Sequence, residues 1–254
     1  MLEVTILKTQ HLGEQEARKL LPYVQSSDAF GIEFSENSIE TAREIEESWD
    51  TILGKGISRS KFLGRLGSSF QTLKGGEYLA KALDYVFRNR VALYLSERWA
   101  DPNETKELAR LYSLGVSQFE SGLRSIHDGN ISEGLKVFYE GEKNKIASLI
   151  KRDRNIAENL LTAEANLRGH YTLLRDVDPI RLGIQIGANH HPERYVSMPV
   201  KVVRLDEHLI PVKKLINQTS DLIYDGASLD EVAPLILEFA KQTKGLRVLH
   251  LSNL

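Results

Sequence analysis

Cysteine is absent from this sequence. Its absence excludes disulfides, thiolate metal sites, iron–sulfur clusters and cysteine nucleophiles. Any bound metal would need His, Asp, Glu or neutral oxygen ligands. Such ligands suit manganese, iron, cobalt or a histidine-rich zinc site, so the expected cofactor is a divalent ion of this group.

Long apolar runs and a strong charge imbalance are also missing. No apolar stretch approaches the roughly 18 residues needed to span a bilayer. The first residues, MLEVTILKTQ, contain no basic segment followed by a long apolar run. We therefore expect a cytoplasmic protein with no membrane partner. The net charge of -2 gives no reason to expect nucleic acid as the main partner.

Several familiar catalytic and nucleotide-binding motifs are incomplete or lacking. The glycine-rich stretch 54–67 has Arg59 where a dinucleotide fingerprint needs its third glycine, and the sequence has no phosphate loop. GVSQF resembles a nucleophile elbow but ends in Phe119. No His-Glu-x-x-His helix is present. Nucleotide-binding, serine-hydrolase and zincin functions therefore lose support.

The composition and the local patterning indicate a folded α/β protein. The 254 residues are 41% hydrophobic and 27% charged, as in a globular protein with a sizeable core. β-rich segments at 3–8, 29–34 and 91–97 alternate with helical patterns at 13–25, 36–53 and 77–90. This alternation predicts βαβ units and a mainly parallel central sheet flanked by helices.

The middle of the chain is helical and interrupts the α/β pattern. Asp101-Pro102 starts one helix, and Asn130 with Glu133 forms a capping-box pattern at the start of a second. We expect a single domain over 1–254 in which 101–176 forms a lid or subdomain between the third and fourth strands. The fourth strand is expected at 181–188. Beyond it we expect a strand at 200–205 and a capped helix from Ser228.

Ionisable side chains follow four of the expected strands. They are His11, Glu33, Glu97 and His190. In a parallel sheet the carboxyl ends of the strands form the edge where ligands bind. Each group alone could simply mark the point where a strand leaves the core. Together, two histidines and two glutamates could bind one metal or carry out acid and base steps.

His190 and His191 are adjacent and should differ in role. Side chains of neighbouring residues in extended chain point in opposite directions, and Pro192 favours an extended conformation at His191. One metal is therefore not expected to bind both, and we favour His190. Arg154 belongs to a charged helical segment, where an exposed ion pair is the ordinary explanation. If that helix covers the strand ends, Arg154 could instead stabilise a developing oxyanion.

The order of these segments resembles the TraB/Tiki family and the wider group with the ChaN-like haem-binding proteins and the erythromycin esterases. The matching stretches are ILKTQH, DAFGIEF, VALYLSE, RDRNIAENL and IGANH, spread over 3–195. The resemblance implies a metal-dependent peptidase or related hydrolase, with His11, Glu33 and His190 at the centre and Arg154 as a supporting cation. The first family motif is Gly-x-x-His, and here Lys8 replaces its glycine.

Our leading hypothesis is a metal-dependent hydrolase that acts on peptide or other small acyl substrates. His11, Glu33 and His190 would bind manganese, cobalt, iron or zinc, while Glu97 acts as general base and Arg154 stabilises the oxyanion. The alternative is a non-catalytic protein that binds haem or a metal complex, or a regulatory protein. Lys8 favours this alternative, because a cation beside His11 would weaken metal binding. The sequence leaves the substrate and a homo-oligomer open.

Overall fold

The computed structural model describes residues 1–9, 13–33, 49, 51–52, 76–98, 102–205 and 211–244. The chain divides into two compact units. The first comprises residues 1–98 and 153–206, and the second comprises residues 99–152 and 207–254. Predictions that concern His11, the segment 36–48 and the glycine-rich stretch lie outside the described residues.

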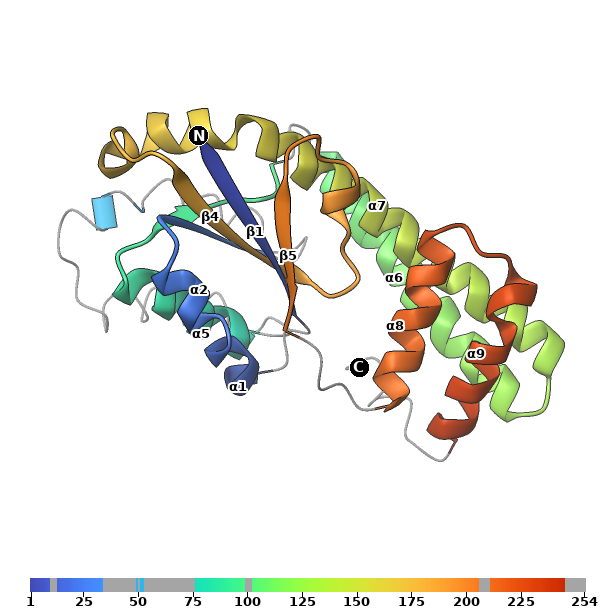
Figure 1. The fold of residues 1–254 in the computed structure, drawn as a ribbon. Helices are drawn as coiled ribbons and strands as arrows, with labels where there is room; N and C mark the ends of the chain where they lie inside the picture. The colour runs from blue at the N-terminus through green and yellow to red at the C-terminus, as the bar shows by residue number, and fades with distance from the viewer. Residues whose placement is uncertain are drawn as a thin grey trace. The chain divides into compact units, whose positions relative to one another are not determined.

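A five-stranded parallel sheet forms the centre of the first unit (Figure 1). The strand order is β3-β2-β4-β1-β5. The strands are β1 (Leu2–Thr9), β2 (Ala29–Ile32), β3 (Ala92–Tyr94), β4 (Ile180–Gly187) and β5 (Val200–Arg204). The predicted α/β class and the parallel sheet are therefore confirmed. The register pairs Thr9 with Gly187 and Ile32 with Gln185, so three strands end at nearly the same level.

Helices cover both faces of this sheet. In Figure 1, α1 (Gly13–Arg18), α2 (Leu21–Gln25) and α5 (Gly76–Arg88) lie on one side, and the part of α7 (Ile131–His170) that belongs to this unit, residues 153–170, lies on the other. Residues 182–186 of β4 are all buried, which requires cover on both faces. Two short 3-10 helices, η2 (Thr172–Leu174) and η3 (Pro192–Arg194), flank β4 along the chain. The helix predicted at 13–25 is interrupted and forms α1 and α2.

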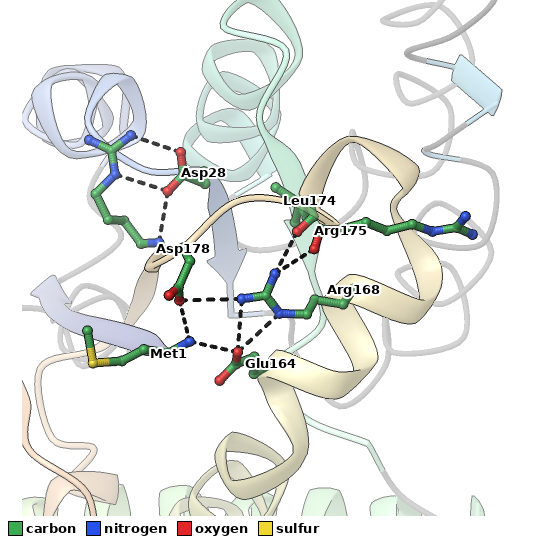
Figure 2. A network of polar contacts seen from close by, with 8 residues as sticks. Met1, Asp28, Glu164, Arg168, Leu174, Arg175 and Asp178 are labelled. Carbon is green, nitrogen blue, oxygen red and sulfur yellow. Dashed lines mark hydrogen bonds and ion pairs between the residues drawn. The ribbon is translucent and has the colours of Figure 1, made fainter.

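Ion pairs lie at the amino end of β1, opposite the carboxyl ends of the strands. The Met1 ammonium donates to Glu164 at 2.8 Å and to Asp178 at 2.5 Å. Arg168 donates to the same Glu164 carboxylate at 2.9 Å, so the Met1 ammonium, one residue before β1, joins an ion-pair network on α7 (Figure 2). Surface pairs of this kind stabilise a fold by about 1 kcal/mol or less each. This network therefore contributes modestly to the attachment of the first residues to α7.

The second unit is helical and has its own core. It contains α6 (Pro102–His127), the first part of α7, α8 (Pro211–Tyr224) and α9 (Leu229–Thr243). The rings of Phe119, Phe138 and Phe239 meet at centroid distances of 4.4 to 6.0 Å. The predicted cap of α9 is confirmed, because Ser228 and Glu231 form a capping box. The helix α8 was not predicted.

The backbones of α6 and α7 approach each other closely through glycine. A Cβ atom added at Gly122 would lie 2.3 Å from the backbone nitrogen of Phe138, and one at Gly141 would lie 2.5 Å from that of Phe119. Only glycine fits such contacts without moving a backbone.

Among the helices that the structure describes, none is long and apolar enough to cross a membrane.

Candidate functional site

The carboxyl ends of β2 and β4 bring two of the predicted site residues together. Glu33 follows β2 directly, and His190 follows β4 after a short turn. His190 Nε2 lies 3.1 Å from Glu33 Oε1. The His190 side chain is 3% exposed and that of Glu33 is 9% exposed, so the pair is shielded from water. The strand-end argument thus places a carboxylate and an imidazole in direct contact.

The backbone of β4 fixes the orientation of the Glu33 carboxylate. The N–H of Gly187 donates a hydrogen bond to Glu33 Oε2, which leaves Oε1 facing the imidazole. A Cβ at position 187 would lie 3.3 Å from Glu33 Oε2 and 3.4 Å from the ring of His190. Glycine at this position therefore lets strand, carboxylate and imidazole approach one another closely.

Asp153 of α7 holds the other ring nitrogen of His190. Its Oδ1 lies 2.5 Å from His190 Nδ1, and its Oδ2 accepts a hydrogen bond from the backbone N–H of His191 at 2.8 Å. Asp153 is fully buried. Burial opposes a charge on His190, but the Glu33 and Asp153 carboxylates outweigh it and raise the pKa of His190 to about 10. In the absence of a competing cation, this imidazole carries a proton on both nitrogens at neutral pH.

Asp153 was not predicted, although the sequence contains a signal for it. Asp153, Ile156, Ala157 and Leu160 follow the spacing of one helix face, and all four are buried. A carboxylate on an otherwise apolar face needs a partner, because burying an unpaired charge is costly. The sequence could thus have indicated a buried partner for Asp153, but not that the partner is His190.

The segment after Asp153 also fixes the exit of β3. Asn155 accepts a hydrogen bond from the Arg98 backbone N–H at 3.0 Å and donates to the Arg98 carbonyl at 2.9 Å. Asn159 donates to the Ser96 carbonyl at 3.1 Å. Glu97 lies between these two anchored residues and is 3% exposed. One helix therefore positions His190 and the backbone on either side of Glu97.

A second polar cluster lies at the end of β1, beside the two histidines. Lys8 is 1% exposed, and its Nζ donates to Glu193 Oε1 at 2.6 Å and contacts His191 Nδ1 at 3.0 Å. Burial lowers the pKa of Lys8. Burial alone would raise the pKa of Glu193, but hydrogen bonds from His191 and Lys8 outweigh it and bring that pKa to about 2. Glu193 thus compensates the charge of Lys8, and His191 belongs to this cluster.

Thr9, the next residue of β1, organises a buried polar layer below the site. Its hydroxyl accepts hydrogen bonds from Tyr78 at 3.1 Å and from Gln185 at 3.0 Å. Burial raises the pKa of Tyr78, so its hydroxyl remains a donor throughout the ordinary pH range. This layer joins α5, β1 and β4 directly beneath the strand ends.

The predicted oxyanion-binding residue, Arg154, has an exposed side chain. Its guanidinium lies 5.4 Å from the centre of the Tyr195 ring, in the segment that follows the two histidines. Its predicted role in catalysis stays a prediction, as does that of Glu97. His11, the third predicted metal ligand, lies outside the described residues.

The separation of the two donor atoms in the Glu33–His190 pair can be compared with that of two ligands on one metal. Ligands bound at about 2.0–2.2 Å lie about 2.8–3.1 Å apart in an octahedral site and about 3.3–3.6 Å apart in a tetrahedral one, and the 3.1 Å of the ion pair is close to the octahedral value. Metal-binding histidines commonly donate their other N–H to a carboxylate, as His190 does to Asp153. In the part of the chain that the structure describes, no third His, Asp or Glu completes a metal-binding group. Glu33 and His190 could thus supply two ligands to a metal, with Asp153 behind His190, and any further ligand would have to come from outside the described residues.

Comparisons of the chain with protein-family models, with curated proteins and with solved structures find no match.

Proposed function

We propose that the protein is a metal-dependent hydrolase that acts on peptide or other acyl bonds. The observation that carries this proposal is the contact between Glu33 Oε1 and His190 Nε2, with Asp153 on the opposite ring nitrogen. The resemblance to the TraB/Tiki family supports the same function. It adds His11 as a third ligand.

Each residue of the site would have a separate task. Glu33 and His190 would hold the ion, and Asp153 would keep the His190 proton on Nδ1 so that Nε2 can act as a ligand. When bound, a divalent ion supplies Lewis-acid activation of water. Glu97 would accept the proton of that water as general base. Arg154 would leave the Tyr195 ring and approach the developing oxyanion.

The alternative function is a binding protein for haem or another metal complex. The resemblance to the ChaN-like proteins suggests it, and Lys8 favours it, because the charge of Lys8 would weaken metal binding to His11. Because Glu193 Oε1 lies 2.6 Å from Lys8 Nζ, that charge is largely compensated. This contact makes the hydrolase the better supported of the two functions.

Metal-dependent hydrolysis of a peptide library tests the proposal. We expect chelated protein to be inactive and one of manganese, cobalt, zinc or ferrous iron to restore turnover. Glu97→Gln should lower kcat by at least about 100-fold, as expected for loss of a general base. Glu158→Gln, on the exposed face of α7, is the matched control. A Soret band on adding haem, without turnover under any metal, would contradict the hydrolase and favour the binding protein.

A further inference from the structure

The edge strand β5 differs from the four other strands in its exposure. No residue of β5 is fully buried, whereas β2 and β3 are buried throughout. Val202 is 39% exposed, and Lys201 and Arg204 are exposed as well. Among the described residues, β5 pairs only with β1, and no strand lies against its outer edge. The outer edge therefore has backbone groups that could pair with an added strand.

The register shows which residues direct their backbone outward. Leu205 donates its N–H to the Lys8 carbonyl, so its backbone faces β1. In a parallel pair, residues alternate between the two edges of the strand. Lys201 and Val203 therefore face β1 as Leu205 does. Val200, Val202 and Arg204 direct their N–H and C=O groups outward, and a peptide centred on Val202 could form two hydrogen bonds with it.

The charge of the strand selects its occupant. The sequence VKVVR has two cations and no anion. A second copy of β5 would bring like charges together across the new pair, which disfavours self-pairing. An extended peptide with acidic side chains at alternate positions would instead place an opposite charge across from Lys201, which is exposed on one face of the strand.

We infer that the outer edge of β5 binds an acidic, extended segment of the substrate as an added strand. The inference deepens the proposed function and rests on it, because it assigns a substrate class to the same enzyme. In the strand register, Arg204 of β5 lies opposite Lys8 of β1, and the Lys8 side chain contacts His191, the neighbour of His190. A peptide added along the outer edge of β5 would therefore run toward the strand ends where the Glu33–His190 pair lies.

The sheet geometry sets the length of substrate that this edge favours. From an added strand, β5 and β1 must be crossed to reach β4, a distance of about three strand spacings or 14 Å. An extended chain advances about 3.3 Å per residue, so about four residues bridge this distance. We expect cleavage at about that separation from the acidic segment, and a KM that rises when the segment is removed.

Fluorescence anisotropy with a labelled peptide of about six alternating valine and glutamate residues tests the binding step. The full chain should bind it at least about tenfold more tightly than the same peptide with lysine for glutamate, and added salt should reduce the difference. Val202→Pro removes an outward donor and leaves the hydrogen bonds to β1 intact, so it should weaken binding about fivefold or more relative to Val202→Ala. Lys201→Glu should reverse the charge preference.

Several outcomes would overturn the inference. Equal binding of the glutamate and lysine peptides would overturn it. Equal affinities of Val202→Pro and Val202→Ala for the glutamate peptide would also overturn it, provided that both variants keep the melting temperature of the wild type. If Val202→Pro does not fold, the charge preference of Lys201→Glu decides alone. Self-association that Lys201→Glu abolishes, without peptide binding, would identify a second copy as the occupant and refute a substrate segment.

Binding of the glutamate peptide to the His190→Ala variant, which lacks the proposed metal ligand but keeps β5, separates this inference from the proposed function. Retained peptide binding without metal-dependent turnover in the wild type would refute the hydrolase and leave the edge as a peptide-binding surface. Metal-dependent turnover of short peptides without any binding of the acidic probe would refute the edge alone.

Discussion

Replacement of Asp153 by Asn tests how α7 controls His190, the proposed metal ligand. The Asp153 carboxylate accepts hydrogen bonds from His190 Nδ1 at 2.5 Å and from the His191 N–H at 2.8 Å. An asparagine keeps the shape and can still accept from His191. Its NH₂ group, however, faces Nδ1 as a donor. The substitution therefore favours the His190 tautomer with its proton on Nε2, the atom that faces Glu33.

The size of the effect follows from these two contacts. Loss of one buried hydrogen bond to a charged group costs about 1.5–3 kcal/mol of folding stability. Loss of an outer-shell carboxylate typically lowers metal affinity about 10- to 100-fold. We expect both losses in Asp153→Asn. Urea unfolding of the protein freed of metal by a chelator measures the loss of stability, and calorimetric metal titration measures the loss of metal affinity.

Glu158→Gln is the matched control for this variant, because it also removes one carboxylate from α7 but at an exposed position. Its metal affinity and stability should equal those of the wild type within experimental error. Wild-type metal affinity in Asp153→Asn would refute a positioning role for Asp153. A large loss in Glu158→Gln would show that the charge of the helix matters, rather than the contact with His190.

Three further predictions concern other parts of the structure. The pKa of His190 is raised from 6.5 to about 10 in the folded state, so the metal-free protein should keep the resulting stabilisation below about pH 6.5 and lose it as the pH rises through about 10. Denaturant unfolding of the wild type and of His190→Gln over this pH range measures the loss, and an equal loss in the variant would contradict the prediction. Lys8→Met should destabilise the fold by about 3 kcal/mol by leaving Glu193 without its cation, whereas the double variant with Glu193→Gln should recover part of the loss in a double-mutant cycle. Gly122→Ala should lower the folding stability by about 1–3 kcal/mol, because its Cβ would meet the backbone nitrogen of Phe138. Gly169→Ala, whose Cβ would have nothing within 4 Å, should instead stabilise α7. Equal melting temperatures of the two variants would refute the close packing of α6 and α7.

The parallel sheet could be predicted because its buried strands are apolar, and because the segments between the first three strands carry apolar residues at helical spacing. The strand order could not be predicted in the same way. β4, from the second half of the chain, lies between β1 and β2, and only long-range packing specifies this position. The helix α8 was missed although Pro211 starts it and Val212, Leu215, Ile216 and Ile223 follow helical spacing.

The candidate site was predicted in part for a clear physical reason. Parallel strands deliver their carboxyl ends to one edge, and this rule brought Glu33 and His190 together. It could not identify Asp153, because α7 comes to the site through tertiary packing. Nor could it pair Lys8 with Glu193, since the turn between His191 and Glu193 decides where that carboxylate lies.

The central claim is that the Glu33–His190 pair binds a divalent metal. Thermal shift of the chelated wild type and of His190→Ala, each supplied with manganese, cobalt, zinc or ferrous iron, tests it most directly. At 100 times its dissociation constant, a metal should stabilise the folded wild type by about 2.7 kcal/mol, which raises the melting temperature measurably. We predict this rise with at least one metal in the wild type and none in His190→Ala. Equal shifts in both proteins, or no shift in either, would contradict the claim.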